Sequence, residues 1–96
     1  MVEQKQQGPI DLLYPLPNTR IYIPTDLGHH KSRTVFEAVH REPDSVLYWH
    51  LDQQYLGATE HFHQLALNIL PGEHTLTVVD DNGQRLMRRF EVLGSD

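Results

Sequence analysis

Histidines are the main side chains of this 96-residue chain that could do chemistry. The chain has seven of them, and two form a His61-Phe62-His63 motif, whose alternate residues share one face of an extended strand. With His29, His30 or His74 as a third ligand, the pair could bind zinc, which takes three or four ligands in a near-tetrahedral arrangement. Exposed histidines are common on the polar side of a strand in any case. We therefore favour solvated histidines and expect no metal and no cofactor.

Three other chemical patterns are weaker. Asp80-Asp81-Asn82-Gly83 resembles a calcium loop but lacks the length and the terminal glutamate of an EF-hand, so we favour a hairpin turn, in which Asn-Gly is common. Serine, histidine and aspartate are all present, but no Gly-x-Ser-x-Gly elbow accompanies them. Since the chain has no cysteine, a thiol nucleophile, a thiolate metal site and a disulfide are excluded.

A sugar-binding surface is a further hypothesis. Tyr48, His50 and Tyr55 lie on or near one predicted hairpin, with Gln53 and Gln54 at its tip. Sugars stack on exposed aromatic rings and form hydrogen bonds with neighbouring amides. The alternative, which we favour, is that Trp49 and one of the tyrosines lie in the core, which would leave too few aromatic rings for a platform.

Length and charge limit the class of protein. Eight basic residues against 13 acidic ones give a net charge of −5, which is the opposite of the balance in nucleic-acid binders. The chain has no apolar run near the ~20 residues of a membrane span and no apolar leader segment. Its length suits one domain, which we expect at residues 10–94, with residues 1–9 as a linker or a remnant of cloning.

The chain reads as short strands separated by turns. Six prolines leave little room for a long helix. We predict strands at residues 11–14, 20–23, 34–40, 45–51, 55–57, 74–79 and 85–93, and a loop at residues 26–32. Residues 62–70 fit a helix about as well as a strand, and we favour the strand because turns recur every 8–12 residues elsewhere.

Alternation along the predicted strands separates a core face from a solvent face. In residues 45–51, one face carries Leu47, Trp49 and Leu51, and the other carries Val46, Tyr48 and His50. Arg88 falls on the apolar side of the last strand, which predicts an edge position or a bulge there. About seven short strands around one buried tryptophan are typical of an all-β, immunoglobulin-like sandwich with Greek-key connections.

The segment around Pro71 is expected to form a corner between two strands. In immunoglobulin-like domains, a tyrosine near this point commonly forms a hydrogen bond to the corner backbone. We hypothesise that His74 takes this role here, and that Pro71, Gly72 and His74 are structural residues.

The ordered segments of the chain resemble the C-terminal domain of the penicillin-binding protein 1C family. The resemblance covers about residues 10–93, through LLYPLPNTRIYIP, TVFEAVH, SVLYWHLDQQYLG and FHQLALNILPGEHTLTVVDDNGQRLMRRFEVL. Its most specific parts are LYWHLD and PGEHTL, followed by VVD and Gly83. The chain departs from the family at Gln53-Gln54, where the family often has a glycine, and this departure predicts a wider hairpin.

The resemblance implies an accessory domain rather than an enzyme. The proteins that the chain resembles are bifunctional class A peptidoglycan synthases. They have a membrane anchor, a glycosyltransferase domain, a transpeptidase domain and this β-rich tail, which faces the periplasm. The transpeptidase needs a Ser-x-x-Lys motif, but Ser32, Ser45 and Ser95 have no lysine three residues later. We therefore expect a non-catalytic module excised from an inner-membrane-anchored protein, which reaches the membrane only through the anchor of that parent.

The resemblance also suggests the kind of partner. We expect docking onto the transpeptidase domain of the same parent chain or onto another cell-wall protein. A surface with a net charge of −5 and few spare aromatic rings suits polar protein contacts better than sugar stacking. The alternative partner is peptidoglycan, bound through Tyr48, His50 and Tyr55.

Overall fold

The structure is a computed structural model that describes residues 8–23 and 33–94. Their strands are β1 (Ile10–Tyr14), β2 (Thr19–Tyr22), β3 (Thr34–His40), β4 (Val46–Leu51), β5 (Gln54–Glu60), β6 (Gln64–Leu67), β7 (Gly72–Asp80) and β8 (Arg85–Leu93). The described residues form no helix, and so none that could span a membrane. The predicted all-β class is therefore confirmed, with eight strands rather than about seven.

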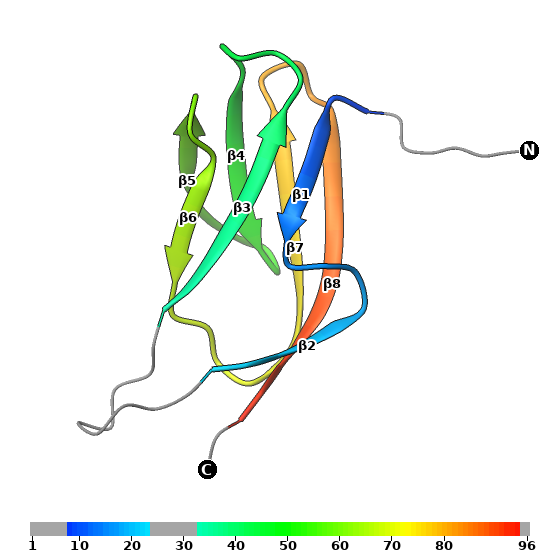
Figure 1. The fold of residues 1–96 in the computed structure, drawn as a ribbon, viewed down its shortest axis with the longest axis vertical. Coiled ribbons are helices and arrows are strands. Elements are labelled where there is room, and N and C mark those ends of the chain that lie inside the picture. The colour runs from blue at the N-terminus through cyan, green and yellow to red at the C-terminus, as the bar shows by residue number, and fades with distance from the viewer. Residues whose placement is uncertain (1–7, 24–32, 95–96) are drawn as a thin grey trace, which may run out of the picture.

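The strands form two facing sheets (Figure 1). The smaller sheet has the order β1-β3-β6, and the larger one has the order β2-β8-β7-β4-β5. Neighbouring strands are antiparallel except β2 and β8, which are parallel. The chain crosses from the larger sheet to the smaller one between β5 and β6, and both of these strands are sheet edges.

The predicted strands are present, with shifted ends. The strand favoured for residues 62–70 is confirmed as β6, which is restricted to Gln64–Leu67. β5 extends to Glu60 because Ala58, Thr59 and Glu60 continue the pairing with β4. The loop predicted at residues 26–32 lies outside the described residues.

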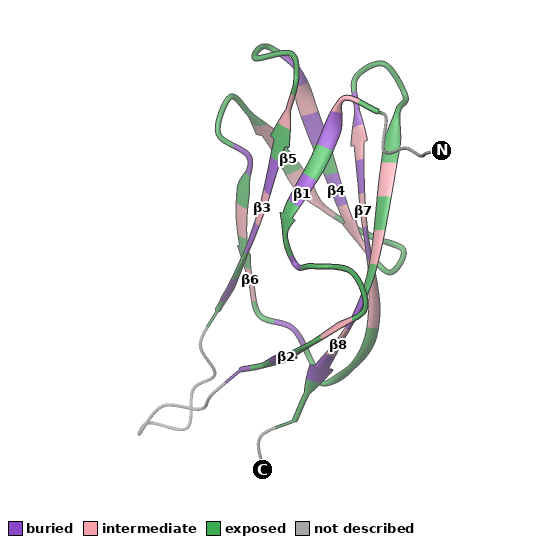
Figure 2. Ribbon diagram, turned by 45° about the vertical axis from the view of Figure 1, so that its right-hand side comes forward, coloured by how far each residue is buried: buried purple, intermediate pink, exposed green. Residues whose placement is uncertain are grey.

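Trp49 lies at the centre of the core, as predicted. Its side chain and that of Leu47 are completely buried, and Leu51 packs against the same cluster. Phe36 of the smaller sheet meets Phe90 of the larger sheet edge to face, with ring centroids 5.5 Å apart, a favourable arrangement of two aromatic rings. Figure 2 shows the resulting alternation of exposure along β1 and β8.

Two hydrogen bonds in series give the indole N–H of Trp49 a partner in this apolar core. The Trp49 indole N–H donates to Thr59 Oγ1 at 2.8 Å, and Thr59 Oγ1 lies 2.7 Å from His63 Nδ1. Because the indole can only donate, the threonine oxygen accepts from it, and the threonine O–H can donate a hydrogen bond to His63 Nδ1. The chain of bonds joins β4 and β5 to the crossing into β6.

The structure explains why the charged residue Arg88 lies on the apolar side of β8. The pairing of β8 with β7 shows no register shift, so the alternative of a bulge is wrong. Within the described residues β2 pairs only with Phe90–Leu93, so Arg88 lies where β8 pairs with β7 alone, which agrees with the edge alternative although β8 as a whole is an inner strand. The guanidinium donates to Leu12 O at 3.3 Å and to Pro15 O at 2.7 Å, so this charge ties β8 to the backbone in and after β1.

The corner before β7 carries the hydrogen bond expected of His74. Its Nε2 donates to Leu70 O at 2.7 Å, and its Nδ1 lies 2.8 Å from Asp52 Oδ2. Burial alone would raise the pKa of Asp52, but hydrogen bonds from His74 and from the Thr75 N–H lower it overall. Gly72, at the start of β7, has a φ of 128°. Residues other than glycine strongly disfavour this conformation.

The contacts of His74 predict its contribution to stability. Substitution His74→Ala should lower the free energy of unfolding by about 1–3 kcal/mol, because two hydrogen bonds of about 0.5–1.5 kcal/mol each are lost. Urea unfolding followed by tryptophan fluorescence measures the change. His61→Asn, at an exposed histidine whose φ of 68° asparagine also tolerates, is the matched control and should change stability by less than about 0.5 kcal/mol. Equal unfolding midpoints for the two variants would disprove a structural role of His74.

Candidate functional site

The outward face of the larger sheet gathers the residues that sequence analysis singled out for binding. Tyr48 and His50 point outward from β4 because Leu47 and Trp49 point inward. Tyr55 of β5 lies directly opposite His50, and their ring centroids are 5.4 Å apart with the planes tilted by 60°. We call Tyr48, His50 and Tyr55 the aromatic strip.

Both tyrosines of the aromatic strip are accessible. Tyr48 is 37 % exposed and Tyr55 is 55 % exposed, and the other two tyrosines of the chain are exposed as well. The favoured expectation that one tyrosine lies in the core is therefore wrong, although its statement about Trp49 holds. The physical reason is alternation: a buried residue at position 49 sends its neighbour at position 48 to the opposite face.

The hairpin that carries Tyr55 is tighter than predicted. Leu51 pairs with Gln54, so the turn has only Asp52 and Gln53 at its tip. Asp52 adopts a φ of 59°, which aspartate tolerates better than most residues, and so the tight turn forms without a glycine. A register shift beside Trp49 and His50 then places Tyr55 outward.

His50 contributes its ring to this face. Its Nδ1 is buried and has no hydrogen-bond partner among the described residues. Unpaired buried polar atoms of this kind are few in native proteins. The contact with Tyr55 makes the imidazole part of an aromatic surface.

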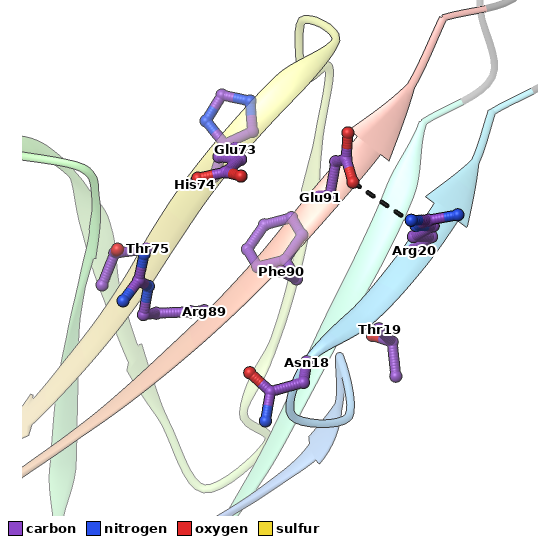
Figure 3. A pocket seen from close by; sticks show the side chains of 9 residues that line it. All are labelled: Asn18, Thr19, Arg20, Glu73, His74, Thr75, Arg89, Phe90 and Glu91. Carbon is purple, nitrogen blue, oxygen red and sulfur yellow. Dashed lines mark ion pairs between the residues drawn. The ribbon is translucent and has the colours of Figure 1, made fainter.

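An open depression of about 500 Å³ lies on the same sheet, over β2, β7 and β8. Glu73 and Thr75 of β7 and Arg89 and Glu91 of β8 line it, together with Asn18 and Arg20 (Figure 3). Arg20 Nε is 3.5 Å from Glu91 Oε1. A second depression, lined by Asp52, Gln53, Thr75, Thr77 and Met87, lies between this charged region and the aromatic strip.

The structure separates the two histidines of the His-x-His motif. His61 has a φ of 68° and an exposed side chain, whereas His63 is buried against Thr59. The turn at His61 breaks the alternation that would place both rings on one face. No three potential ligands gather around a metal position in the described part of the chain; His29 and His30 lie outside that part.

Sequence analysis missed a buried pair between the sheets. His40 Nε2 lies 2.9 Å from Asp80 Oδ2, and both side chains are almost fully buried. Burial alone would raise the pKa of Asp80, but hydrogen bonds from His40 and from the Gln84 and Asn82 N–H groups lower it overall. The available signal was parity, since Asp80 shares the inward face of Leu76 and Val78.

The hydrogen bonds of the buried polar groups link structural elements. His40 Nδ1 accepts from the Glu42 N–H at 2.9 Å, and Asp80 Oδ1 accepts from the N–H groups of Asn82 and Gln84. The aromatic and charged side chains of the larger sheet, in contrast, lie at its surface. Fold and surface together define a β-rich domain with aromatic and charged residues on one outer face.

Comparison with known families identifies the family of this domain. The Penicillin-Binding Protein C-terminus Family matches residues 2–90. The match covers nearly the whole chain, and the chain belongs to this family. No curated protein and no solved structure matches it.

The buried histidine of the motif predicts how stability depends on pH. Burial, followed by repulsion from His40 and His61, lowers the pKa of His63. In the unfolded chain this ring binds a proton below about pH 6.5, while in the folded chain it resists protonation. Folding stability should therefore fall as the pH falls below 6.5, by at most about 1.4 kcal/mol per pH unit from this group.

Variants at the two positions of the motif test this assignment. Urea unfolding between pH 7.5 and 5.5 should show a shallower dependence on pH for His63→Gln than for the unaltered protein. His61→Gln, at the exposed position, should keep most of the dependence, because burial is the leading cause of the shift. An unchanged slope in His63→Gln would show that another group titrates.

Proposed function

We propose that this chain is a non-catalytic accessory domain of a periplasmic, inner-membrane-anchored peptidoglycan synthase, and that it docks onto another protein domain during cell-wall assembly. Membership of a family that forms the C-terminus of penicillin-binding proteins supports this role. We also propose that its two sheets form an immunoglobulin-like Greek-key sandwich. The buried Trp49 of β4, the crossing between sheets after β5 and the bond from His74 to Leu70 O support this fold.

The observation that carries the docking proposal is an apolar surface on the smaller sheet. Leu13, Val35 and Val39 point outward from β1 and β3, and each is between 44 % and 48 % exposed. The solvent face of an antiparallel sheet is ordinarily polar. Three exposed aliphatic side chains on two neighbouring strands therefore favour contact with another protein.

The transpeptidase domain of the same parent chain is the partner that we favour. Two domains on one chain meet at an effective concentration that can reach millimolar, so a modest interface is sufficient. Asp11 and Glu37, next to the apolar side chains on the same face, carry negative charge. We expect the partner surface to combine an apolar patch with basic residues.

A charge placed in this apolar surface should prevent docking. We expect the double substitution Val35→Lys and Val39→Lys to weaken binding to the separately purified remainder of the parent synthase at least about tenfold, or about 1.4 kcal/mol. Biolayer interferometry gives the dissociation constants. Met87→Lys, at a 57 % exposed residue of the other sheet, is the control and should bind normally. Docking through the smaller sheet is wrong if the double variant and the Met87→Lys control bind the remainder of the synthase equally well.

The aromatic strip favours a second function, the binding of peptidoglycan. Tyr48 and Tyr55 are both exposed, and the latter contacts the His50 ring. Aromatic faces of this kind stack on the apolar faces of sugar rings, and Gln54 follows the turn next to Tyr55 with an exposed amide. A glycan could therefore lie across β4 and β5.

Retention on purified sacculi tests the second function. Tyr48→Ala and Tyr55→Ala should each weaken retention about tenfold, a loss of about 1.4 kcal/mol, because each removes a stacking surface. Tyr14→Ala is a matched control, since Tyr14 is 38 % exposed but lies on the smaller sheet. A co-sedimentation assay at several protein concentrations gives the affinities, and equal retention of all three variants would refute the aromatic strip as a sugar site.

A further inference from the structure

The depression over β2, β7 and β8 holds a carboxylate without a counter-charge. Glu73 lies directly opposite Glu91 across the β7–β8 pair, and Arg20 lies opposite Glu91 on its other side. Like charges at opposed positions of a sheet repel each other. Arg20 offsets the charge of Glu91 at 3.5 Å, but Glu73 forms no ion pair within the described part of the chain.

A cation without a counter-charge lies one outward position further along the same strands. Arg89 is opposite Thr75, two residues and therefore about 7 Å along the sheet from the glutamates. Its guanidinium forms no ion pair among the described residues. Figure 3 shows the Arg89 guanidinium beside Thr75, and the backbone bond from Asn18 N to Arg89 O, 3.1 Å long, holds Asn18 next to β8.

This arrangement favours a ligand that carries one positive and one negative group. An ammonium group suits Glu73 and Glu91, which can accept its hydrogen bonds. A carboxylate suits Arg89, whose planar guanidinium binds carboxylates through two parallel hydrogen bonds. A ligand with two carboxylates would be repelled by the glutamates, and one with two ammonium groups would be repelled by the arginines.

We propose that this depression binds the α-amino-carboxylate end of a diamino-acid side chain on a peptidoglycan stem peptide. We call Glu73, Glu91 and Arg89, with Asn18 and Thr75, the zwitterion site. This inference rests on the second candidate function, because it assumes that the glycan lies on the aromatic strip. The volume of about 500 Å³ is in the range of small-molecule sites.

The spacing between the two sites fits a short peptide. His50 lies opposite Thr77, which lies opposite Met87; Arg89 is two residues beyond that row, and Glu91 is four residues beyond it. The separation is therefore about 7–14 Å along the strands and, because β4 and β8 are two strands apart, about 10 Å across them, or about 12–17 Å in all. Three extended residues span up to about 10 Å, and the side chain of the diamino acid extends the reach further. The depression lined by Thr75, Thr77 and Met87 provides the path between the sites.

The test uses the 96-residue chain and a disaccharide-peptide whose third residue is a diamino acid with a free α-amino-carboxylate end. NMR titration measures its affinity, together with the affinities of the peptide-free disaccharide, the free diamino acid and an analogue with lysine in place of the diamino acid. We expect the complete ligand to bind at least about tenfold more tightly than each of the other three. The lysine analogue loses affinity because it lacks the carboxylate that Arg89 binds.

Charge variants assign this gain to the zwitterion site. Arg89→Gln and Glu73→Gln should each reduce the affinity for the complete ligand about tenfold, and Arg89→Gln should not affect the affinity for the lysine analogue. Arg85→Gln is the control, since Arg85 is on the same face of β8 but opposite Val79, outside the depression. Thermal unfolding checks that each variant is folded.

The outcomes separate this inference from the function on which it rests. Unchanged affinity in both charge variants, while Tyr48→Ala still weakens binding of the disaccharide, would overturn the zwitterion site and leave the glycan site intact. Equal affinities of the complete ligand and its lysine analogue would overturn it too, and equal binding of the free diamino acid would overturn the stem-peptide source. If neither the disaccharide nor the complete ligand binds, both the second function and this inference are wrong.

Discussion

The structure depends on the complete burial of one indole between two sheets. Trp49 places the largest apolar side chain of the chain at the interface, and Phe36, Leu47, Leu76 and Val78 close around it without exposed surface. Burial of such a ring is favourable only if its N–H finds a partner. Thr59 supplies that partner and is itself hydrogen-bonded to His63 at the crossing between sheets. Core and connection are thus fixed by the same residues.

Burial of Trp49 also determines what the larger sheet shows to solvent. In a strand with a two-residue period, inward positions at 47 and 49 require outward positions at 48 and 50. The register shift beside Trp49 adds Tyr55 to the same face. The outward position of these side chains is therefore a geometric consequence of the core, whereas their aromatic character comes from the residue types at those positions.

The sequence could predict features that depend on local alternation, but not those that depend on register between distant strands. The faces of β4 and β7 followed from their apolar spacing, and the strand at β6 followed from the spacing of turns. The outward position of Tyr55 depends on a register shift, and the pairing of Arg20 with Glu91 depends on the parallel contact of β2 and β8. Asp80 was missed because an aspartate before Asn-Gly also fits a solvated turn, whereas its parity with Val78 directs it inward to His40.

The two outer faces of the sandwich differ in a way that suits different partners. The smaller sheet exposes aliphatic side chains, while the larger one exposes aromatic rings beside charged side chains. Arg88 ties β8 to the backbone of Leu12 and Pro15, and the pair of His40 and Asp80 ties β3 to β7. Because these bonds cross between the sheets, the faces keep a fixed relative orientation. A domain held through one face therefore presents the other in a defined direction, so that the proposed docking onto a synthase would also orient the proposed glycan surface.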